Sequence, residues 1–259
     1  MRDHTQTVWN QVAEDYQNVF RLGSNSYNES LLHFWQEEKM IFPGCRVLDI
    51  GCGVGKYGVM LSRLGCDVTL TDISPEMLRY AEINLANTPS PWRTFLCDFH
   101  EVTGKDAPFS TPFDFTLSTM SPAISDLHSV KKMSEITKGT CFLACFCSWN
   151  QPLRDEIIRR AGRVPSCPHG DLRNHCENMY RIISSAGFTP KIKVVEYSWQ
   201  DKRTPDEMTE YLLQHDFRGE TDYSDWRQAL YRASKEIGAG KEFLTDAVFT
   251  HVAWIWWQT

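Results

Sequence analysis

The stretch that decides the fold is Val47-Leu48-Asp49-Ile50-Gly51-Cys52-Gly53-Val54-Gly55-Lys56. A short apolar run, typical of a buried strand, contains an acid near its end and passes into three closely spaced glycines. Glycines between a strand and a helix let a ligand approach the backbone and the helix N-terminus. The stretch therefore predicts a ligand site at the carboxyl edge of a parallel sheet.

Strands and helices alternate along the rest of the chain. Residues 67–70, 94–97, 113–118, 141–148, 192–199 and 246–257 are predicted strands in addition to 45–50, and 4–22, 28–40, 56–64, 74–87 and 171–186 are predicted helices. Alternation of this kind implies parallel strands joined by right-handed crossovers. We therefore expect an α/β fold with a Rossmann-like, doubly wound, mostly parallel sheet of seven strands.

The composition argues against several classes of protein. The 259 residues carry 27 Lys and Arg against 33 Asp and Glu, a net charge of −6, which disfavours nucleic acid as a partner. No apolar run reaches the ~18 residues of a membrane helix, and the polar N-terminus does not resemble a signal peptide. Nine cysteines, an odd number partly inside strands, favour reduced thiols and a cytoplasmic location. We expect a monomer or a homodimer.

Two classes of ligand use such a glycine turn. Gly53-x-Gly55-x-x-Gly58 matches the dinucleotide fingerprint, and Asp72 lies about 20 residues downstream, where an acid holds a ribose. Asp49 opposes this interpretation, because a carboxylate beside the turn repels a pyrophosphate. It suits a cationic ligand without phosphate, such as S-adenosylmethionine. An NAD(P)-dependent oxidoreductase is the alternative, and a binding protein without catalytic activity is a third hypothesis.

The sequence at these positions resembles class I S-adenosylmethionine-dependent methyltransferases, in their small-molecule, type 11-like branch. The segment 47–55 resembles the first motif of that family, and Thr71-Asp72-Ile73-Ser74 resembles the acidic second motif. Leu96-Cys97-Asp98-Phe99 resembles the third, and Phe113-Asp114 with the loop 118–122 resembles the fourth. The resemblance covers residues 8–149. It implies an antiparallel last strand and S-adenosyl-L-methionine as cofactor, with S-adenosyl-L-homocysteine as product.

The resemblance also implies roles for individual residues. Asp49 and the glycine backbone serve the methionine end, Asp72 the ribose hydroxyls, and Asp98 the adenine amino group. Ile73 and Phe99 sandwich the adenine. The full set of implied cofactor-binding residues is Tyr16, Asp49, Gly51, Cys52, Gly53, Gly55, Asp72, Ile73, Met77, Cys97, Asp98, Phe99, Ser118 and Thr119.

We expect one methyltransferase domain with helical cap insertions over residues 1–259. Its parts are an N-terminal helical lid (1–42), a cofactor-binding core (43–149), the second half of the sheet (150–199), a helical cap insertion (200–245) and a final strand (246–259). Within the cap, Thr204-Pro205-Asp206-Glu207 has the pattern of a capping box and predicts a helix start. Residues 223–237 predict a second helix.

Methyl transfer is an in-line displacement, in which the protein mainly positions the acceptor and excludes water. The expected partner is a small-molecule acceptor. A base is needed only where that acceptor must lose a proton, and the candidates are Asp126, His128, His169 and His175. The absence of Asn-Pro-Pro-Tyr at the fourth motif, where Ser118-Thr119-Met120-Ser121-Pro122 stands, weakens an exocyclic amine as acceptor.

Cysteines and histidines gather at Cys167, His169, His175 and Cys176. Their spacing fits no standard zinc pattern, so no metal site is predicted, and a packed or solvated loop is the simpler interpretation. The C-terminal Trp254, Trp256 and Trp257 lie in a predicted strand, where sheet packing is the expected role.

Overall fold

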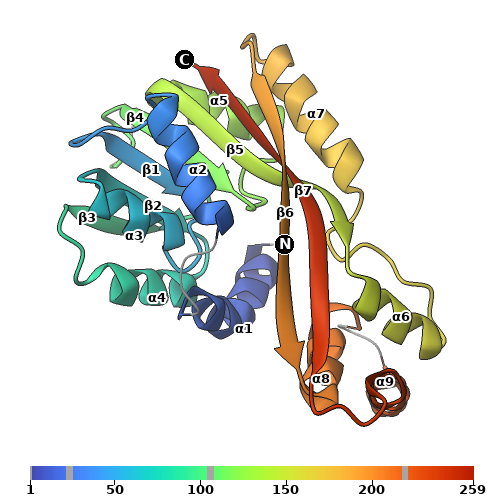
Figure 1. Ribbon diagram of the computed structural model, residues 1–259. Helices are drawn as coiled ribbons and strands as arrows, with labels where there is room; N and C mark the ends of the chain where they lie inside the picture. Colours follow the sequence, from blue (N-terminus) through green and yellow to red (C-terminus); the bar gives the residue numbers. More distant parts are fainter. Residues whose placement is uncertain (1, 22–25, 104–107, 218–220) are drawn as a thin grey trace. The chain divides into compact units, whose positions relative to one another are not determined.

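The computed structural model describes residues 2–21, 26–103, 108–217 and 221–259 (Figure 1). Its strands are β1 (Arg46–Ile50), β2 (Asp67–Asp72), β3 (Trp92–Leu96), β4 (Phe113–Thr119), β5 (Thr137–Asn150), β6 (Lys191–Arg203) and β7 (Leu244–Gln258). Its helices are α1 (Arg2–Arg21), α2 (Ser26–Glu37), α3 (Lys56–Arg63), α4 (Pro75–Leu85), α5 (Leu127–Glu135), α6 (Pro152–Arg160), α7 (Leu172–Ser185), α8 (Pro205–His215) and α9 (Tyr223–Gly238).

The described strands form one seven-stranded sheet in the order β3-β2-β1-β4-β5-β7-β6. β1 pairs in parallel with β2 and β4, β2 pairs in parallel with β3, and β4 pairs in parallel with β5. The last strand, β7, is antiparallel. The order reverses at β1, and ligands of such open sheets bind beside that reversal. The expected Rossmann-like, doubly wound fold is confirmed.

The chain divides into two compact units. Unit 1 contains Met1–Cys145, Glu177–Lys193 and Ala253–Thr259, and unit 2 contains Phe146–Cys176 and Val194–Val252. Strands β5, β6 and β7 each have residues in both units. The expectation of a single domain with the boundaries given above stays a prediction.

The core of unit 1 is built around an aromatic cluster. Trp35 of α2 is fully buried and meets the ring of Phe115 of β4 edge-on at 5.4 Å and that of Phe142 of β5 at 5.3 Å. Trp254 of β7 is 2% exposed and donates a hydrogen bond from its indole to the Tyr27 hydroxyl at 3.1 Å. The expected packing role of the C-terminal tryptophans is confirmed for Trp254, Trp256 and Trp257, all of which are buried.

Helix α3 runs very close to the sheet. A Cβ at Gly58 would lie 2.6 Å from Cδ2 of Leu70 in β2, and a Cβ at Gly55 would lie 2.9 Å from Cβ of Ala81 in α4. A real Cβ does not tolerate either separation. Both glycines therefore allow the helices and the strand to approach one another.

Unit 2 has its own apolar core between α6, α8 and α9. Its buried members include Ile157, Leu212, Phe217 and Leu230. Thr204 caps α8 as expected, since its hydroxyl accepts from the Glu207 amide and the Glu207 carboxylate accepts from the Thr204 amide. Both helices predicted in the 200–245 insertion are present as α8 and α9.

Two helices were not expected from the sequence, α5 and α6. Each is nine residues long and mostly polar, so its apolar periodicity is weak. The α5 start does carry a local signal, because Asp126 and Ser129 form a reciprocal capping box.

In the part of the chain that is described, no helix has the length and apolar character needed to cross a membrane.

Candidate functional site

A cavity of about 700 Å³ lies in unit 1 at the carboxyl ends of β1 to β4. Its described walls come from α1, from the glycine turn after β1 and from the loops after β2, β3 and β4. Eleven of the fourteen residues expected to bind a cofactor line it: Tyr16, Gly51, Cys52, Gly53, Asp72, Ile73, Met77, Cys97, Asp98, Phe99 and Thr119. That these side chains contact a cofactor stays a prediction.

The glycine turn has the backbone conformation that favours glycine. Gly51, Gly53 and Gly55 have φ values of 69°, 54° and 77°, in the left-handed region that L side chains rarely adopt. Gly51 has a second constraint, because its Cβ would lie 2.8 Å from the Cβ of Ser121 in the loop after β4. The turn after β1 and the loop after β4 therefore meet at a point where only a hydrogen fits.

Asp72 ends β2 and fixes two neighbouring backbone segments. One carboxylate oxygen accepts from the Gly53 amide and the other from the Ser74 amide, both at 2.9 Å. Burial raises the pKa of Asp72, and the hydrogen bonds from the Ser74 and Gly53 amides oppose that rise. Ser74 in turn caps α4 by accepting from the Met77 amide at 3.1 Å. The acid is thus held rigidly at the cavity wall.

Asp49, in β1, is the unusual acid of the site. It is 1% exposed, and among the described residues neither of its carboxylate oxygens has a hydrogen-bond partner. Burial, with the negative charge of Asp72 in addition, raises its pKa to about 8. Asp49 does not itself line the cavity, but Cys52 does, and burial, the charge of Asp72 and the charge of Asp49 together raise the pKa of the Cys52 thiol. An unpartnered buried carboxyl beside a cavity calls for a cationic or donor group.

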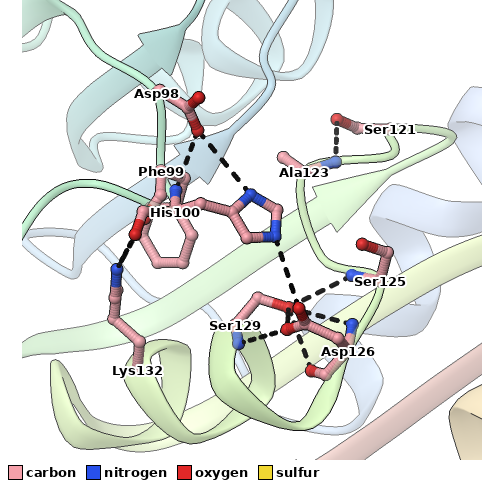
Figure 2. Close-up of polar contacts among 9 residues, drawn as sticks. All are labelled: Asp98, Phe99, His100, Ser121, Ala123, Ser125, Asp126, Ser129 and Lys132. Carbon is pink, nitrogen blue, oxygen red and sulfur yellow. Dashed lines mark hydrogen bonds and ion pairs between the residues drawn. The ribbon is translucent and has the colours of Figure 1, made fainter. Parts of the chain in front are cut away.

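The loop after β3 carries Asp98 and Phe99 and is held by α5 (Figure 2). The Asp98 carboxylate accepts from the His100 amide at 3.0 Å. The ammonium of Lys132, a side chain on α5 that is largely buried, donates to the carbonyls of Phe99 at 2.9 Å and His100 at 2.8 Å. The loop conformation is therefore fixed before any ligand arrives.

Helix α1 forms one side of the cavity. The Gln6 side chain donates to the Ile73 carbonyl at 2.9 Å, and the Ser74 hydroxyl donates to the Asn10 side chain at 2.6 Å. Tyr16 lines the cavity from α1, and its pKa is raised by burial and by the charge of Asp72. Helix α2, in contrast, packs its buried face into the core through Trp35. Within the expected 1–42 lid, the described lining residues come from α1.

Three of the expected cofactor residues do not line the cavity. Asp49 lies behind the wall, and Gly55 serves helix packing as described above. The Ser118 hydroxyl, 2% exposed, donates to the Ile50 carbonyl at 2.9 Å and so joins β4 to β1. Gly55 therefore allows close packing against α4, and Ser118 links two neighbouring strands.

The four candidate bases lie outside the described walls of the cavity. Asp126 caps α5, accepting from the Ser129 amide at 2.7 Å, and His128 is exposed on the same helix. His169 and His175 belong to unit 2. Burial and the charge of Arg154 lower the pKa of His169, whose ring stacks on Phe146 at 5.0 Å.

Four cysteines and histidines that lie close together in the sequence have different surroundings in the structure: Cys167, His169, His175 and Cys176. Cys167 and His175 are exposed, whereas Cys176 is buried with its sulfur 2.8 Å from the sulfur of Cys147 on β5. The Cys176 thiol also donates to the Phe146 carbonyl at 3.1 Å. The described residues contain no group of three or more His, Cys, Asp or Glu that would hold a metal ion.

The cavity is also lined by residues outside the expected cofactor-binding set: Trp9, Val19, Phe20, Val54, Lys56, Tyr57, Thr71, His100, Glu101 and Met120–Ala123. Of these, Val54, Thr71 and Met120–Pro122 belong to segments that resemble the family motifs. Lys56 is the one lysine or arginine among the described lining residues, and burial lowers its pKa. Its place directly after Gly55 was a usable signal, since it is the first residue of a helix that starts at the turn. Trp9, Val19 and Phe20 lie on α1, in the part of the chain that was expected to form the N-terminal lid.

Comparison with known protein families covers the part of the chain that contributes all of the described lining residues outside α1. A family model described as a methyltransferase domain matches residues 47–138. Over these residues the chain is similar to methyltransferase domains. The matched segment spans β1 to the start of β5 and includes the glycine turn, Asp72, the loop after β3 and α5. The resemblance to methyltransferases is confirmed.

Named relatives match over short segments. A ubiquinone biosynthesis O-methyltransferase from Xanthomonas campestris pv. campestris is 41% identical over 46 residues, 18% of this chain and 19% of the relative. A magnesium-protoporphyrin O-methyltransferase from Rhodobacter capsulatus is 50% identical over 42 residues, 16% of this chain and 19% of the relative. The matched part thus spans about a fifth of the length of these relatives.

Solved structures extend the likeness of fold beyond the methyltransferase domain. Magnesium protoporphyrin IX methyltransferase from Synechocystis PCC 6803, crystallised with bound S-adenosylhomocysteine, superposes with a TM-score of 0.54 at 14% sequence identity. The superposition covers 75% of this chain and 92% of that one. At this identity the match concerns the fold alone, a Rossmann-like, doubly wound sheet.

Proposed function

We propose that this chain is an S-adenosylmethionine-dependent methyltransferase that acts on a small-molecule acceptor. The observation that carries the proposal is Asp49, a buried carboxyl without a partner among the described residues, next to the cavity of a methyltransferase domain. A pyrophosphate at the glycine turn would offer this carboxyl no donor and would further disfavour its ionised form. The ammonium of a methionine moiety would supply the missing partner.

The other polar groups of the cavity fit the remaining parts of that cofactor. Lys56 at the start of α3 offers a cation to its carboxylate. Asp72, held by two amides, offers lone pairs to ribose hydroxyls. Ile73, Asp98 and Phe99 all line the cavity, and in the proposed complex an adenine would lie between Ile73 and Phe99 with its amino group toward the Asp98 carboxylate.

S-adenosylmethionine supplies an electrophilic methyl group on a sulfonium. The chain has to bind the acceptor in line with that methyl and exclude water. Thr119 and the loop Met120–Ala123, which line the cavity after β4, are suited to orient the acceptor. Met120 has a φ of 52°, so this loop holds a conformation that non-glycine residues adopt rarely.

A small molecule as acceptor is supported by the relatives, which are named for ubiquinone biosynthesis and for magnesium protoporphyrin. Those matches cover about a fifth of each relative, so the acceptor of this chain is not inferred from them. A cytoplasmic location, and a monomeric or homodimeric state, stay predictions.

Calorimetry with two probes tests the cofactor. We expect S-adenosylhomocysteine to bind and NADH not to bind; binding of NADH alone would overturn the proposal. Asp72→Ala should weaken S-adenosylhomocysteine binding at least about 10-fold. Asp67→Ala is the matched control, because Asp67 begins the same strand but pairs with Arg93 at 2.7 Å, outside the described cavity walls.

Transfer itself requires a second measurement. The chain, supplied with cofactor labelled on the methyl group, is incubated with a small-molecule extract, and label is sought in the low-molecular-weight fraction. Transfer of label by the intact chain, and its loss in Asp72→Ala, would support methyltransferase activity. Cofactor binding without transfer to any fraction would favour the binding protein.

A further inference from the structure

His100 is placed between two carboxylates at the cavity wall (Figure 2). Its Nδ1 lies 3.6 Å from Oδ1 of Asp98, and its Nε2 lies 3.9 Å from Oδ2 of Asp126. Both distances are in the range of an ion pair. The imidazole therefore links the loop after β3 to the N-terminus of α5.

The contacts on Asp98 are asymmetric. The His100 amide and the His100 ring both approach the same oxygen, Oδ1. Within the described ranges, Oδ2 has no hydrogen-bond or ion-pair partner. Asp98 lines the cavity and its side chain is 22% exposed, so one oxygen is fixed while the other can accept from a ligand.

Helix α5 anchors this arrangement at two points. Asp126 is held by the Ser129 amide at 2.7 Å and by the Ser129 hydroxyl at 2.8 Å, and these contacts lower its pKa. Lys132 donates to the carbonyls of Phe99 and His100 and lies 5.6 Å from the centre of the Phe99 ring. The backbone and the side chain of His100 are thus both tied to α5.

We propose that His100 is a positioning residue that keeps the Asp98 carboxylate turned toward the cavity, so that Asp98 selects a ligand base carrying an amino group. The inference rests on the proposed function, which supplies an adenine base. In addition, selection of the base depends on His100 and, through His100, on Asp126. A carboxylate accepts a hydrogen bond from an amino group and repels a carbonyl oxygen at the same position.

The test compares two probes, S-adenosylhomocysteine and S-inosylhomocysteine, in which a carbonyl replaces the adenine amino group. The intact chain should bind the adenosyl compound about 10- to 100-fold more tightly. His100→Ala should reduce that ratio to about threefold or less, mainly by weakening the adenosyl compound. A merely structural role would weaken both probes equally and leave the ratio unchanged, and this result would overturn the inference.

Conservative variants separate the two contacts of the ring. His100→Asn retains a donor near the position of Nδ1 and should keep most of the ratio, whereas His100→Gln places its donor toward Asp126 and should not. His33→Asn is the matched control: His33 also pairs with a carboxylate, Glu37 at 3.2 Å, but is exposed on α2. It should leave both affinities unchanged.

Asp126→Asn keeps the inference testable if His100→Ala does not fold. Asparagine still caps a helix, so α5 is retained while the charge facing Nε2 is removed. We expect a ratio between those of the intact chain and His100→Ala, and an unchanged ratio would contradict a role for Asp126. An intact chain that binds both probes equally overturns the inference alone, whereas one that binds neither overturns the proposed function as well.

Discussion

Asp49 and Asp72, on the adjacent parallel strands β1 and β2, are coupled: the charge of Asp72 adds to burial in raising the pKa of Asp49 to about 8. Asp72 is compensated by two amides, whereas Asp49 has no hydrogen-bond partner among the described residues. Ionisation of Asp49 therefore destabilises the ligand-free protein. This makes both the free energy of unfolding and the affinity for a ligand depend on pH.

Asp49→Asn should stabilise the ligand-free protein above neutral pH. A carboxyl whose folded pKa is raised makes stability fall as pH rises from its unfolded pKa near 4 to its folded pKa near 8. The amide removes this loss, which we place on the order of 1–3 kcal/mol, or roughly 2–8 °C in Tm. Thermal unfolding at pH 6 and pH 8.5 checks the effect, which should be larger at pH 8.5.

Asp114→Asn provides a control of opposite sign. The Asp114 carboxylate accepts from the Arg46 amide at 2.9 Å and pairs with Lys138 at 3.0 Å, and its pKa is lowered. Its ionised form supports the fold above the unfolded pKa, so neutralisation should lower Tm slightly. A decrease of Tm in Asp49→Asn at pH 8.5 would contradict the assignment.

Binding of S-adenosylhomocysteine should release a proton near neutral pH. With a pKa of about 8, Asp49 is mostly protonated at pH 7, and a bound ammonium favours its ionised form. We expect release of up to ~0.9 proton at pH 7 and an affinity that increases between pH 6 and pH 8. Calorimetry in buffers of different ionisation enthalpy measures the proton count.

The same titration on Asp49→Asn should show no such release and a weaker affinity. Equal proton release in both proteins would show that another group titrates on binding, and the role given to Asp49 would then be wrong.

Gly51→Ala should disturb the turn for two separable reasons. The added Cβ meets the Cβ of Ser121 at 2.8 Å, and φ at this position is 69°. We expect a loss of stability of about 1–3 kcal/mol and weaker S-adenosylhomocysteine binding. Adding Ser121→Gly should recover the steric part but not the conformational part. A double variant as unstable as Gly51→Ala alone would exclude the close approach as a cause.

Cys147 and Cys176 should form a disulfide when oxidised glutathione is supplied. Their sulfurs are 2.8 Å apart, and closure transfers two electrons and the two cysteine protons to the glutathione disulfide, which is reduced to two glutathione thiols. The bond closes a loop that contains α6, so Tm should rise by up to about 10 °C. Non-reducing peptide mapping detects the linked pair.

Cys45 and Cys66 are the matched control for oxidation. The Cys45 thiol donates to the Met40 carbonyl at 3.9 Å and the Cys66 thiol to the Phe42 carbonyl at 3.8 Å. Both residues are fully buried and should remain reduced under the same conditions. Modification of the exposed Cys167 alone, with Cys147 and Cys176 still reactive to alkylation after unfolding, would refute the prediction.

The parts of the site that the sequence predicted are local to the ends of strands. Asp49, Asp72 and Asp98 each follow or end an apolar run, and the glycine turn is contiguous, so residue order alone places them at one edge of a parallel sheet. The start of α4 is equally local, since Ser74 caps it and Pro75 begins it.

The contacts that the sequence did not predict join segments far apart in the chain. Lys132 reaches the carbonyls of Phe99 and His100, and Cys176 reaches Cys147, only because α5 and α7 pack where they do. No periodicity encodes such pairs. The sequence does not predict α5 clearly because the helix is short and mostly polar. Its start is nevertheless marked by the capping box of Asp126 and Ser129.

The proximity of Leu70 to Gly58 changes how a glycine fingerprint is interpreted. A Cβ at Gly58 would lie 2.6 Å from the Leu70 side chain, so the last glycine of the fingerprint is required by the packing of α3 on β2. Any chain in which this helix crosses the sheet so closely has the same requirement, whether its ligand is a dinucleotide or not. Spacing of glycines therefore reports how closely the helix packs on the side chains of the neighbouring strand, while the acid before the first glycine bears on the charge of the ligand.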